Sequence, residues 1–185
     1  MTEIKVNRAP FLALWAKVVA RRLGFTEQEA LTLGKAISGL TAQAKGRKLG
    51  IYQARPAGER AQTAAKREEQ GVDWLEFMGR LVPILRDESG IRAVSGTSPI
   101  DPAGVQRYLQ AKFKEHLPLV EEKLTELARA FPPEQLEERA MDLYMELRPP
   151  VPAGRAGWGK AGVLDLEKVD RMIATRRAAD HRPQA

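Results

Sequence analysis

The sequence predicts an all-α protein, an irregular bundle of about seven or eight helices with little or no strand. Three observations support this prediction. Apolar residues recur at the three- and four-residue spacing of amphipathic helices along most of the chain. Helix-capping patterns precede several of these runs, and a proline or glycine follows most of them. The segments expected to be helical span residues 10–23, 26–45, 58–70, 73–82, 101–116, 118–131, 133–147 and 165–177.

The first helices are bounded by clear local signals. Pro10 is tolerated in a first helical turn, and Gly24 is a typical C-terminal stop. Thr26 and Glu29 have the spacing of a capping box, which predicts the start of the second helix. The segment 58–70 offers only alanines for burial, so we expect a peripheral helix or a linker there.

The middle of the chain predicts one short helix followed by a loop. Asp73 and Glu76 form a second capping-box pattern, and the apolar residues beside them keep a helical spacing. Pro83 is expected to end or kink this helix. Residues 88–99 are rich in glycine and serine, which predicts a loop with one short extended piece at 91–94.

The C-terminal half again predicts helices separated by breakers. Asp101 is followed by a proline, the pattern of an N-cap and a first helical residue. Further prolines divide the chain into the next two helices. Residues 148–162 contain three prolines and four glycines, too many for a regular element, and Asp165 is expected to cap the last helix.

Length and composition predict one domain over residues 1–185, with frayed ends near 1–8 and 178–185. Residues 9–52 form a candidate basic helical subdomain within it. The absence of cysteine excludes disulfides, Cys-ligated metal sites and thiol catalysis. Because no apolar run approaches the roughly 20 residues of a membrane span, and the first residues lack a signal-peptide pattern, we expect a cytoplasmic protein without a membrane partner.

Positive charge is concentrated in the first third of the chain. Residues 1–60 contain 11 basic and 4 acidic side chains, whereas the net charges of 61–135 and 136–185 are −2 and +1. This asymmetry favours an anionic partner, and nucleic acid is the alternative function that we consider. The competing interpretation is a solvated basic face. The candidate nucleic-acid contacts are Lys17, Arg21, Lys45, Arg47 and Lys48.

A helix-turn-helix motif does not account for these cations. Aligning Gly39 with the turn glycine of that motif would place Lys35, Lys45 and Lys48 at buried positions. Burying three lysines without partners is too costly, so only non-specific contacts with phosphates remain.

The first two helices are expected to be covered on two sides. Gly34, Ser38 and Ala42 form a row of small residues spaced by four, here called the small-residue row. Glycine is unfavourable inside a helix, so such a row suggests close packing of another backbone. One interpretation is a central position in a monomeric bundle. The other is a surface for a second copy or another protein, with Trp15 and the row at its centre.

Catalytic chemistry has few candidates, and we expect no catalytic, cofactor-binding or metal-binding residues. Residues 157–162 match G-x-G-x-x-G, but prolines precede the match where a dinucleotide site needs a strand. His181 lies in the tail and His116 at a helix end, where imidazole usually contacts free carbonyls. An enzyme that uses arginine, lysine and carboxylates stays open.

Four segments resemble a family of uncharacterised bacterial proteins. They are Arg8–Ala16, Ala30–Ala36, Ala44–Ile51 and Gly157–Leu166, which together make up 34 of the 185 residues. The resemblance implies a bacterial origin and a helical fold, and it carries no activity or catalytic residue. The sequence therefore predicts a non-catalytic protein that binds itself or another protein through its first two helices, with nucleic-acid binding as the alternative.

Overall fold

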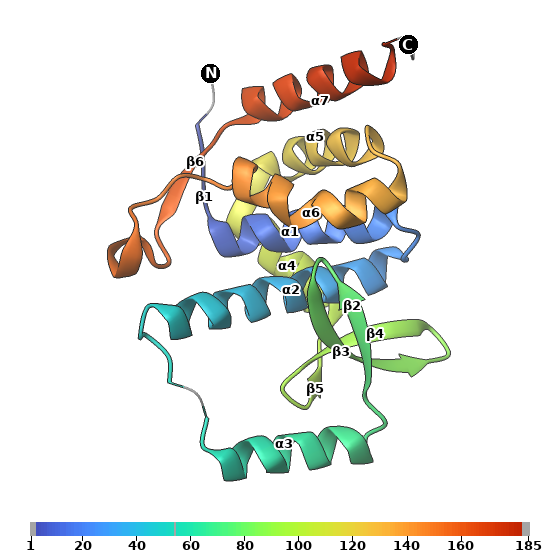
Figure 1. The fold of residues 1–185 in the computed structure, drawn as a ribbon, viewed down its shortest axis with the longest axis vertical. Coiled ribbons are helices and arrows are strands. Elements are labelled where there is room, and N and C mark those ends of the chain that lie inside the picture. The colour runs from blue at the N-terminus through green and yellow to red at the C-terminus, as the bar shows by residue number, and fades with distance from the viewer. Residues whose placement is uncertain (1–2, 54, 183–185) are drawn as a thin grey trace.

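The structure is a computed structural model that describes residues 3–53 and 55–182 (Figure 1). Seven α-helices, two short 3-10 helices and six strands lie in this part of the chain. In chain order they are β1 Ile4–Asn7, α1 Arg8–Arg22, α2 Glu27–Lys48, α3 Ala57–Glu69, β2 Asp73–Phe77, β3 Arg80–Asp87, β4 Gly90–Ser95, β5 Ser98–Pro99, α4 Pro102–Phe113, a 3-10 turn Lys114–His116, α5 Leu117–Arg129, α6 Pro133–Leu147, a 3-10 turn Gly154–Gly157, β6 Ala161–Leu164 and α7 Leu166–Asp180.

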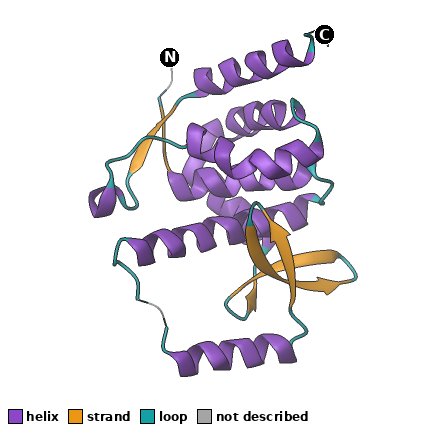
Figure 2. Ribbon diagram, viewed as in Figure 1, coloured by secondary structure: helices purple, strands orange, loops and turns teal. Residues whose placement is uncertain are grey.

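The all-α prediction is wrong, because the protein is a mixed α/β structure (Figure 2). A four-stranded antiparallel sheet has the order β2-β3-β4-β5, and a two-stranded antiparallel sheet joins β1 to β6. Outside the two sheets and the loops, the described chain is helical, as the sequence predicts. All the helices expected outside 73–82 are present, within a few residues of their expected ends.

The segment expected to be a helix over 73–82 is instead most of a β-hairpin. Met78 and Gly79 both have positive φ, 49° and 74°, which is the backbone of a tight two-residue turn. Phe77 pairs with Arg80 across this turn, and the register continues to Asp73 opposite Ile84. The spacing of apolar residues fits both periods over so short a segment, so tertiary packing decides between helix and strand.

One face of the hairpin is buried against α2. Val82 and Ile84 are fully buried in the common core, whereas Leu81 is 62% exposed. β4 is fixed to the same helix by two hydrogen bonds: the Ala93 N–H donates to Thr32 Oγ1 at 3.1 Å, and the Ile91 N–H donates to Glu29 Oε2 at 2.8 Å. The extended piece expected at 91–94 lies within β4.

The chain ends differ from the expected frayed segments. Residues 4–7 form β1, which pairs with β6 from Ile4 opposite Leu164 to Asn7 opposite Ala161. The C-terminal part of the expected loop 148–162 therefore enters a strand, and α7 continues to Asp180. Residues 1–2 and 183–185 of the expected frayed ends lie outside the described residues.

Helix α1 is the centre of the bundle. Every residue from Pro10 to Ala20 is buried, because α2, α4, α5 and α6 all pack around this helix (Figure 1). The predicted capping box is confirmed at the start of α2, where Thr26 and Glu29 exchange side chain–backbone hydrogen bonds. Helix α3 lies apart from the bundle and buries none of its residues, as expected for the segment 58–70.

No helix in the described part of the chain combines the length and apolar character that crossing a membrane requires.

Candidate functional site

Trp15, the centre of the expected partner surface, lies inside the bundle. Its side chain is 0% exposed, and its indole Nε1–H donates a 2.9 Å hydrogen bond to the carbonyl oxygen of Ala140 in α6. A buried indole N–H normally has such a partner. Trp15 therefore joins α1 to α6 within one chain.

The small-residue row is covered by α1 of the same chain. A Cβ atom added at Gly34 would clash with the Ala13 carbonyl oxygen and would lie 3.0 Å from the Lys17 backbone nitrogen. One turn later, the buried Ser38 hydroxyl donates a 2.7 Å hydrogen bond to the Ala9 carbonyl oxygen. Ala42 is half-buried at the end of the row and lines a pocket. The close packing that the row predicts is thus between α1 and α2.

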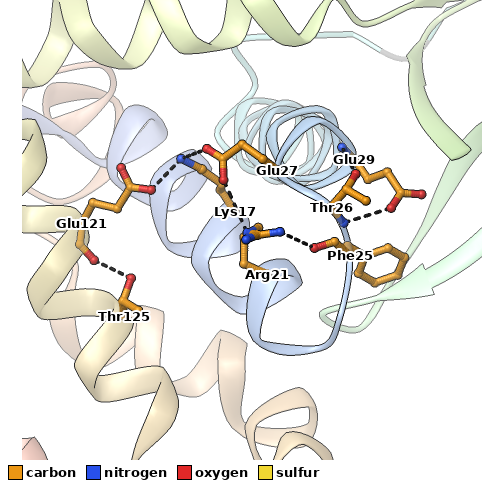
Figure 3. A network of polar contacts seen from close by, with 8 residues as sticks. All are labelled: Lys17, Arg21, Phe25, Thr26, Glu27, Glu29, Glu121 and Thr125. Atoms are coloured by element: carbon orange, nitrogen blue, oxygen red, sulfur yellow. Dashed lines mark hydrogen bonds and ion pairs between the residues drawn. The ribbon is translucent and has the colours of Figure 1, made fainter. Parts of the chain in front are cut away.

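The five expected nucleic-acid contacts divide between the two ends of the α1–α2 pair. Lys17 is 2% exposed, and its Nζ forms ion pairs with Glu27 at 2.6 Å and with Glu121 at 2.5 Å (Figure 3). Arg21 is half-exposed, with its Nε 3.4 Å from Glu27 and an Nη donating to the Phe25 carbonyl oxygen (Figure 3). Both cations are therefore neutralised by carboxylates of the chain itself.

A cavity of about 420 Å³ adjoins this first cluster, between α1 and α5. Its lining includes Arg21, Arg22 and Arg129 together with Glu27 and Glu121. The positive charges in this cavity therefore stand beside negative ones, as they do at most protein surfaces.

Lys45, Arg47 and Lys48 lie at the opposite end of α2. Eighteen residues separate Glu27 from Lys45 along the helix, or about 27 Å at 1.5 Å per residue. Arg47 and Lys48 are exposed, whereas Lys45 is half-buried and lines a second pocket. The sequence-predicted cluster is thus two clusters, and Lys45 of the second one lines a cavity without carboxylates.

The second pocket, here called the cationic pocket, has a volume of about 210 Å³. It lies where the start of α1, the second half of α2, the end of α6 and the loop 148–162 come together. The lining residues are Asn7, Arg8, Ala9, Leu12, Ser38, Thr41, Ala42, Lys45, Tyr144, Met145, Arg148, Gly157, Trp158, Gly159 and Lys160.

Arg8, Lys45, Arg148 and Lys160 give the lining four positive side chains, and charges among the first three lower the pKa of Arg8 and of Lys45. Partial burial lowers the pKa of Arg8, and the nearby charge of Arg148 lowers it further. Partial burial also lowers the pKa of Lys45, with Arg8 and Arg148 adding to the effect. Among the described residues, no Asp or Glu lines the pocket or forms an ion pair with any of the three. The pocket therefore gathers positive charge that the described chain does not neutralise.

A hydrogen bond holds one of these cations in place. The Arg8 Nε–H donates to the Pro149 carbonyl oxygen at 2.8 Å. The buried Tyr144 phenol has its pKa raised by burial, and the positive charges of Arg148 and Arg8 together with a hydrogen bond to Arg148 partly offset that rise. The Arg8 guanidinium is thus oriented before any ligand arrives.

Glycines in the segment that matches G-x-G-x-x-G allow close backbone contacts within the loop that forms one wall of the pocket. A Cβ atom at Gly157 or Gly162 would clash with the carbonyl oxygen of Pro152 or Pro150. A strand, β6, begins within the match at Ala161, where a dinucleotide site requires a helix. The Asn7 side-chain amide donates to the Gly159 carbonyl oxygen at 2.6 Å, which ties the loop to the start of α1.

Two further contacts join this loop to the end of α2. Arg155 donates to the carbonyl oxygens of Leu49 and Gly50, at 2.8 and 3.0 Å. The Trp158 ring meets the Tyr52 ring edge-to-face, with centroids 5.8 Å apart. The loop is therefore a fixed wall with Trp158 at the pocket.

Sequence reasoning identified Lys45 and missed Arg8, Arg148 and Tyr144. Arg8 and Pro149, which are in contact, are 141 residues apart in the sequence. No local pattern links such residues, because their proximity depends on α1 and α6 packing side by side.

No group of three or more His, Asp or Glu side chains in the described part of the chain is placed to hold a metal ion. His116 lies at the end of its 3-10 turn, 3.5 Å from Glu115. His181 follows α7, with its ring Nδ1 2.7 Å from the Arg177 carbonyl oxygen. Neither imidazole lines the cationic pocket.

The chain was compared with models of known protein families, with curated proteins and with solved structures, and no match was found. The resemblance to uncharacterised bacterial proteins stays a prediction. The residues of the cationic pocket are therefore the basis for an inference about function.

Proposed function

We propose that this protein binds a small anionic ligand in the cationic pocket. The observation that carries this proposal is the gathering of Arg8, Lys45 and Arg148 around one cavity with no acidic partner among the described residues. Like charges held together and partly removed from water raise the free energy of the folded state. An anion in the pocket offsets both costs.

The chemistry of the three cations suits a carboxylate or a phosphate. Arginine presents a planar set of N–H donors that matches two oxygens at once, and Arg8 and Arg148 provide two such groups. Helix α1 begins at the same place, and Asn7, its N-cap, makes no side-chain cap. The positive end of the helix dipole adds to the attraction for an anion.

The positive charge of the first third of the chain predicts an anionic partner. A small anion in the pocket agrees with that charge and takes the place of a nucleic acid as the partner. A nucleic-acid backbone is typically contacted by exposed cations distributed along a surface. Arg8, Lys45 and Arg148 are instead half-buried around one cavity. Binding of nucleic acid and self-association remain predictions. Gly34 and Ser38 of the small-residue row do not favour self-association, because α1 covers them.

Isothermal titration calorimetry at low ionic strength tests the proposal with phosphate, acetate, benzoate and phenyl phosphate as probes. We expect at least one probe to bind with 1:1 stoichiometry. In Lys45→Gln the affinity of that probe should fall about tenfold, because a charge-assisted hydrogen bond is lost. Lys48→Gln removes the same charge one helical turn later, outside the pocket, and serves as the matched control.

Three results would contradict the proposal. One is the absence of binding by all four probes. Another is equal weakening by Lys45→Gln and Lys48→Gln, which would indicate general attraction to a basic surface. A third is binding of duplex DNA that depends on Lys48 as much as on Lys45, with a steep dependence on salt.

A further inference from the structure

We propose that the natural ligand of the cationic pocket is a compact amphiphilic acid, in which a carboxylate or phosphate is joined to a single apolar ring or a similarly small group that contacts Trp158. This inference rests on the proposed function and adds the chemistry of the rest of the ligand. It follows from the apolar lining, the arrangement of the charges and the volume of the pocket.

Apolar side chains form the part of the pocket lining that an inorganic ion would not use. Leu12 is buried behind the pocket, Ala42 and Trp158 are half-buried, and Met145 is 49% exposed. An exposed methionine beside a half-exposed tryptophan is typical of surfaces that adapt to apolar partners. A ligand with only a charged group would leave these side chains in contact with water.

Charged and apolar side chains lie close to one another in the lining. Between Ser38 and Lys45 the pocket follows α2 for seven residues, or about 10 Å. Ser38 contacts Ala9 in α1, and Leu12 lies one turn further into the bundle. Lys45 stands at the other end, close enough to Arg8 and Arg148 for their charges to affect its pKa. Trp158 lies near the same end, because its ring contacts Tyr52, which packs on Gly46. A short ligand in which the acid is joined directly to an apolar ring matches this arrangement.

The volume limits the size of the apolar group. About 210 Å³ corresponds to roughly seven water molecules at 30 Å³ each. Sites for drug-sized ligands typically measure about 300–1,000 Å³. A dinucleotide or a long acyl chain therefore exceeds this pocket, whereas one aromatic ring with its acid group is of suitable size.

A panel of paired probes tests the inference. Benzoate and acetate share a carboxylate, and phenyl phosphate and inorganic phosphate share a phosphate, so each pair isolates the ring. We expect the ring to raise affinity about tenfold or more in at least one pair, because it buries apolar surface. The pair with the larger gain then identifies the acid group as a carboxylate or a phosphate.

Variants of the apolar lining give an independent readout. Met145→Ser should weaken the ring-bearing probe several-fold and leave its ring-free partner unchanged. Leu119→Ser is the matched control, because Leu119 is similarly exposed, at 45%, and lies outside the pocket. Trp158→Phe should abolish ligand-dependent quenching of tryptophan fluorescence, since Trp15 is buried elsewhere and Trp74 lies in β2.

The outcomes separate this inference from the proposed function. Lys45-dependent binding with equal affinity for ring-bearing and ring-free probes would overturn the amphiphilic ligand and keep the anion site. Unchanged benzoate and phenyl phosphate binding in both Met145→Ser and Trp158→Phe would also overturn it. Absence of Lys45-dependent binding by every probe would overturn both.

Discussion

The two ends of the α1–α2 helix pair differ in whether positive charge is neutralised by carboxylates. At one end, Lys17 is buried between Glu27 and Glu121. At the other end, Lys45 lies beside Arg8 and Arg148, and no carboxylate of the described chain compensates it. The same residue type is therefore part of the fold at one end and available to a ligand at the other.

This difference teaches that a local excess of basic residues is a poor guide to a binding surface. Lys17 and Lys45 both belong to the strongly positive first third of the chain. What separates them is the single side chain that the neighbouring helix places beside each: α5 brings Glu121 to Lys17, whereas Arg148 at the end of α6 lies near Lys45. A charge is available for function when the fold leaves it without a partner.

The largest expected effect comes from disrupting the contact between α1 and α2 at Gly34. In Gly34→Val, the added side chain meets the backbone of α1 at Ala13 and Lys17. Backbone atoms cannot move aside without separating the two helices, so the free energy of unfolding should fall by about 3 kcal/mol or more. Urea denaturation measures this loss.

The control for Gly34 lies in the same helix. Gly39 has open space where its Cβ would be, so Gly39→Ala should raise the free energy of unfolding by up to about 1 kcal/mol. A similar loss in Gly34→Val and Gly39→Ala would mean that the close approach of α1 to α2 is not what Gly34 provides.

The next largest effect is expected from removing the carboxylates that neutralise Lys17. The double variant Glu27→Gln/Glu121→Gln leaves the Lys17 ammonium buried without a carboxylate, and we expect a loss of about 2–3 kcal/mol in the free energy of unfolding. Glu122→Gln, an exposed neighbour of Glu121, should change it by less than about 0.5 kcal/mol. Thermal and urea denaturation of wild type, the double variant and Glu122→Gln measure these differences. A double variant as stable as wild type would mean that the Lys17 ion pairs do not stabilise the fold.

The pH dependence of stability gives a further test at the same end of the helix pair, through Glu29 in α2. Burial raises the pKa of Glu29, but hydrogen bonds from the Ile91 and Thr26 N–H groups outweigh it, so the net pKa lies below its usual value. Because the folded-state pKa is the lower one, the stabilisation by Glu29 is complete above the unfolded value of about 4.3 and is lost as pH falls through the folded pKa.

Glu29→Gln should therefore be less stable at pH 7 by about 1–2 kcal/mol, with a shallower decline in stability below pH 5. Glu68→Gln in the exposed helix α3 is the control. Parallel acid profiles of wild type and Glu29→Gln would mean that the link from Glu29 to β4 does not stabilise the fold.

The smallest effect is expected at the cationic pocket. Lys45→Gln removes a charge that its neighbours repel, so the free energy of unfolding should stay the same or rise by up to about 1 kcal/mol. Lys17→Gln, the equivalent change at the other end, should lower it instead. A destabilised Lys45→Gln would show that Lys45 has a structural partner, and the contrast between the two ends would fail.

Local sequence signals were enough to place most helices. The capping residues Thr26, Asp101 and Asp165 each accept a backbone hydrogen bond from three residues later, as their spacing predicts. The segment 73–87 could not be assigned in the same way. Asp73 matches a helix cap in sequence, yet its carboxylate accepts from the Trp74 N–H at the start of a strand.

The candidate site was less accessible to sequence reasoning than the fold. Lys45 and the loop 148–162 were recognised separately, but nothing local joined them. The small-residue row predicts close packing, and Gly34 and Ser38 of the row lie against α1. That the packing partner is α1, rather than a second copy, depends on Ser38 reaching Ala9 across 29 residues of sequence.

The sequence by itself determined where most of the helices begin and end, because caps, glycines, prolines and apolar spacing act on the backbone within a few residues. Only the tertiary structure decided that 73–87 forms a hairpin on α2, that residues 4–7 pair with 161–164, and which cations find a carboxylate. Lys17 meets Glu121 across 104 residues and Arg8 meets Pro149 across 141. Such pairings depend on which helices pack together, and that is set by burial of the whole core rather than by any short segment.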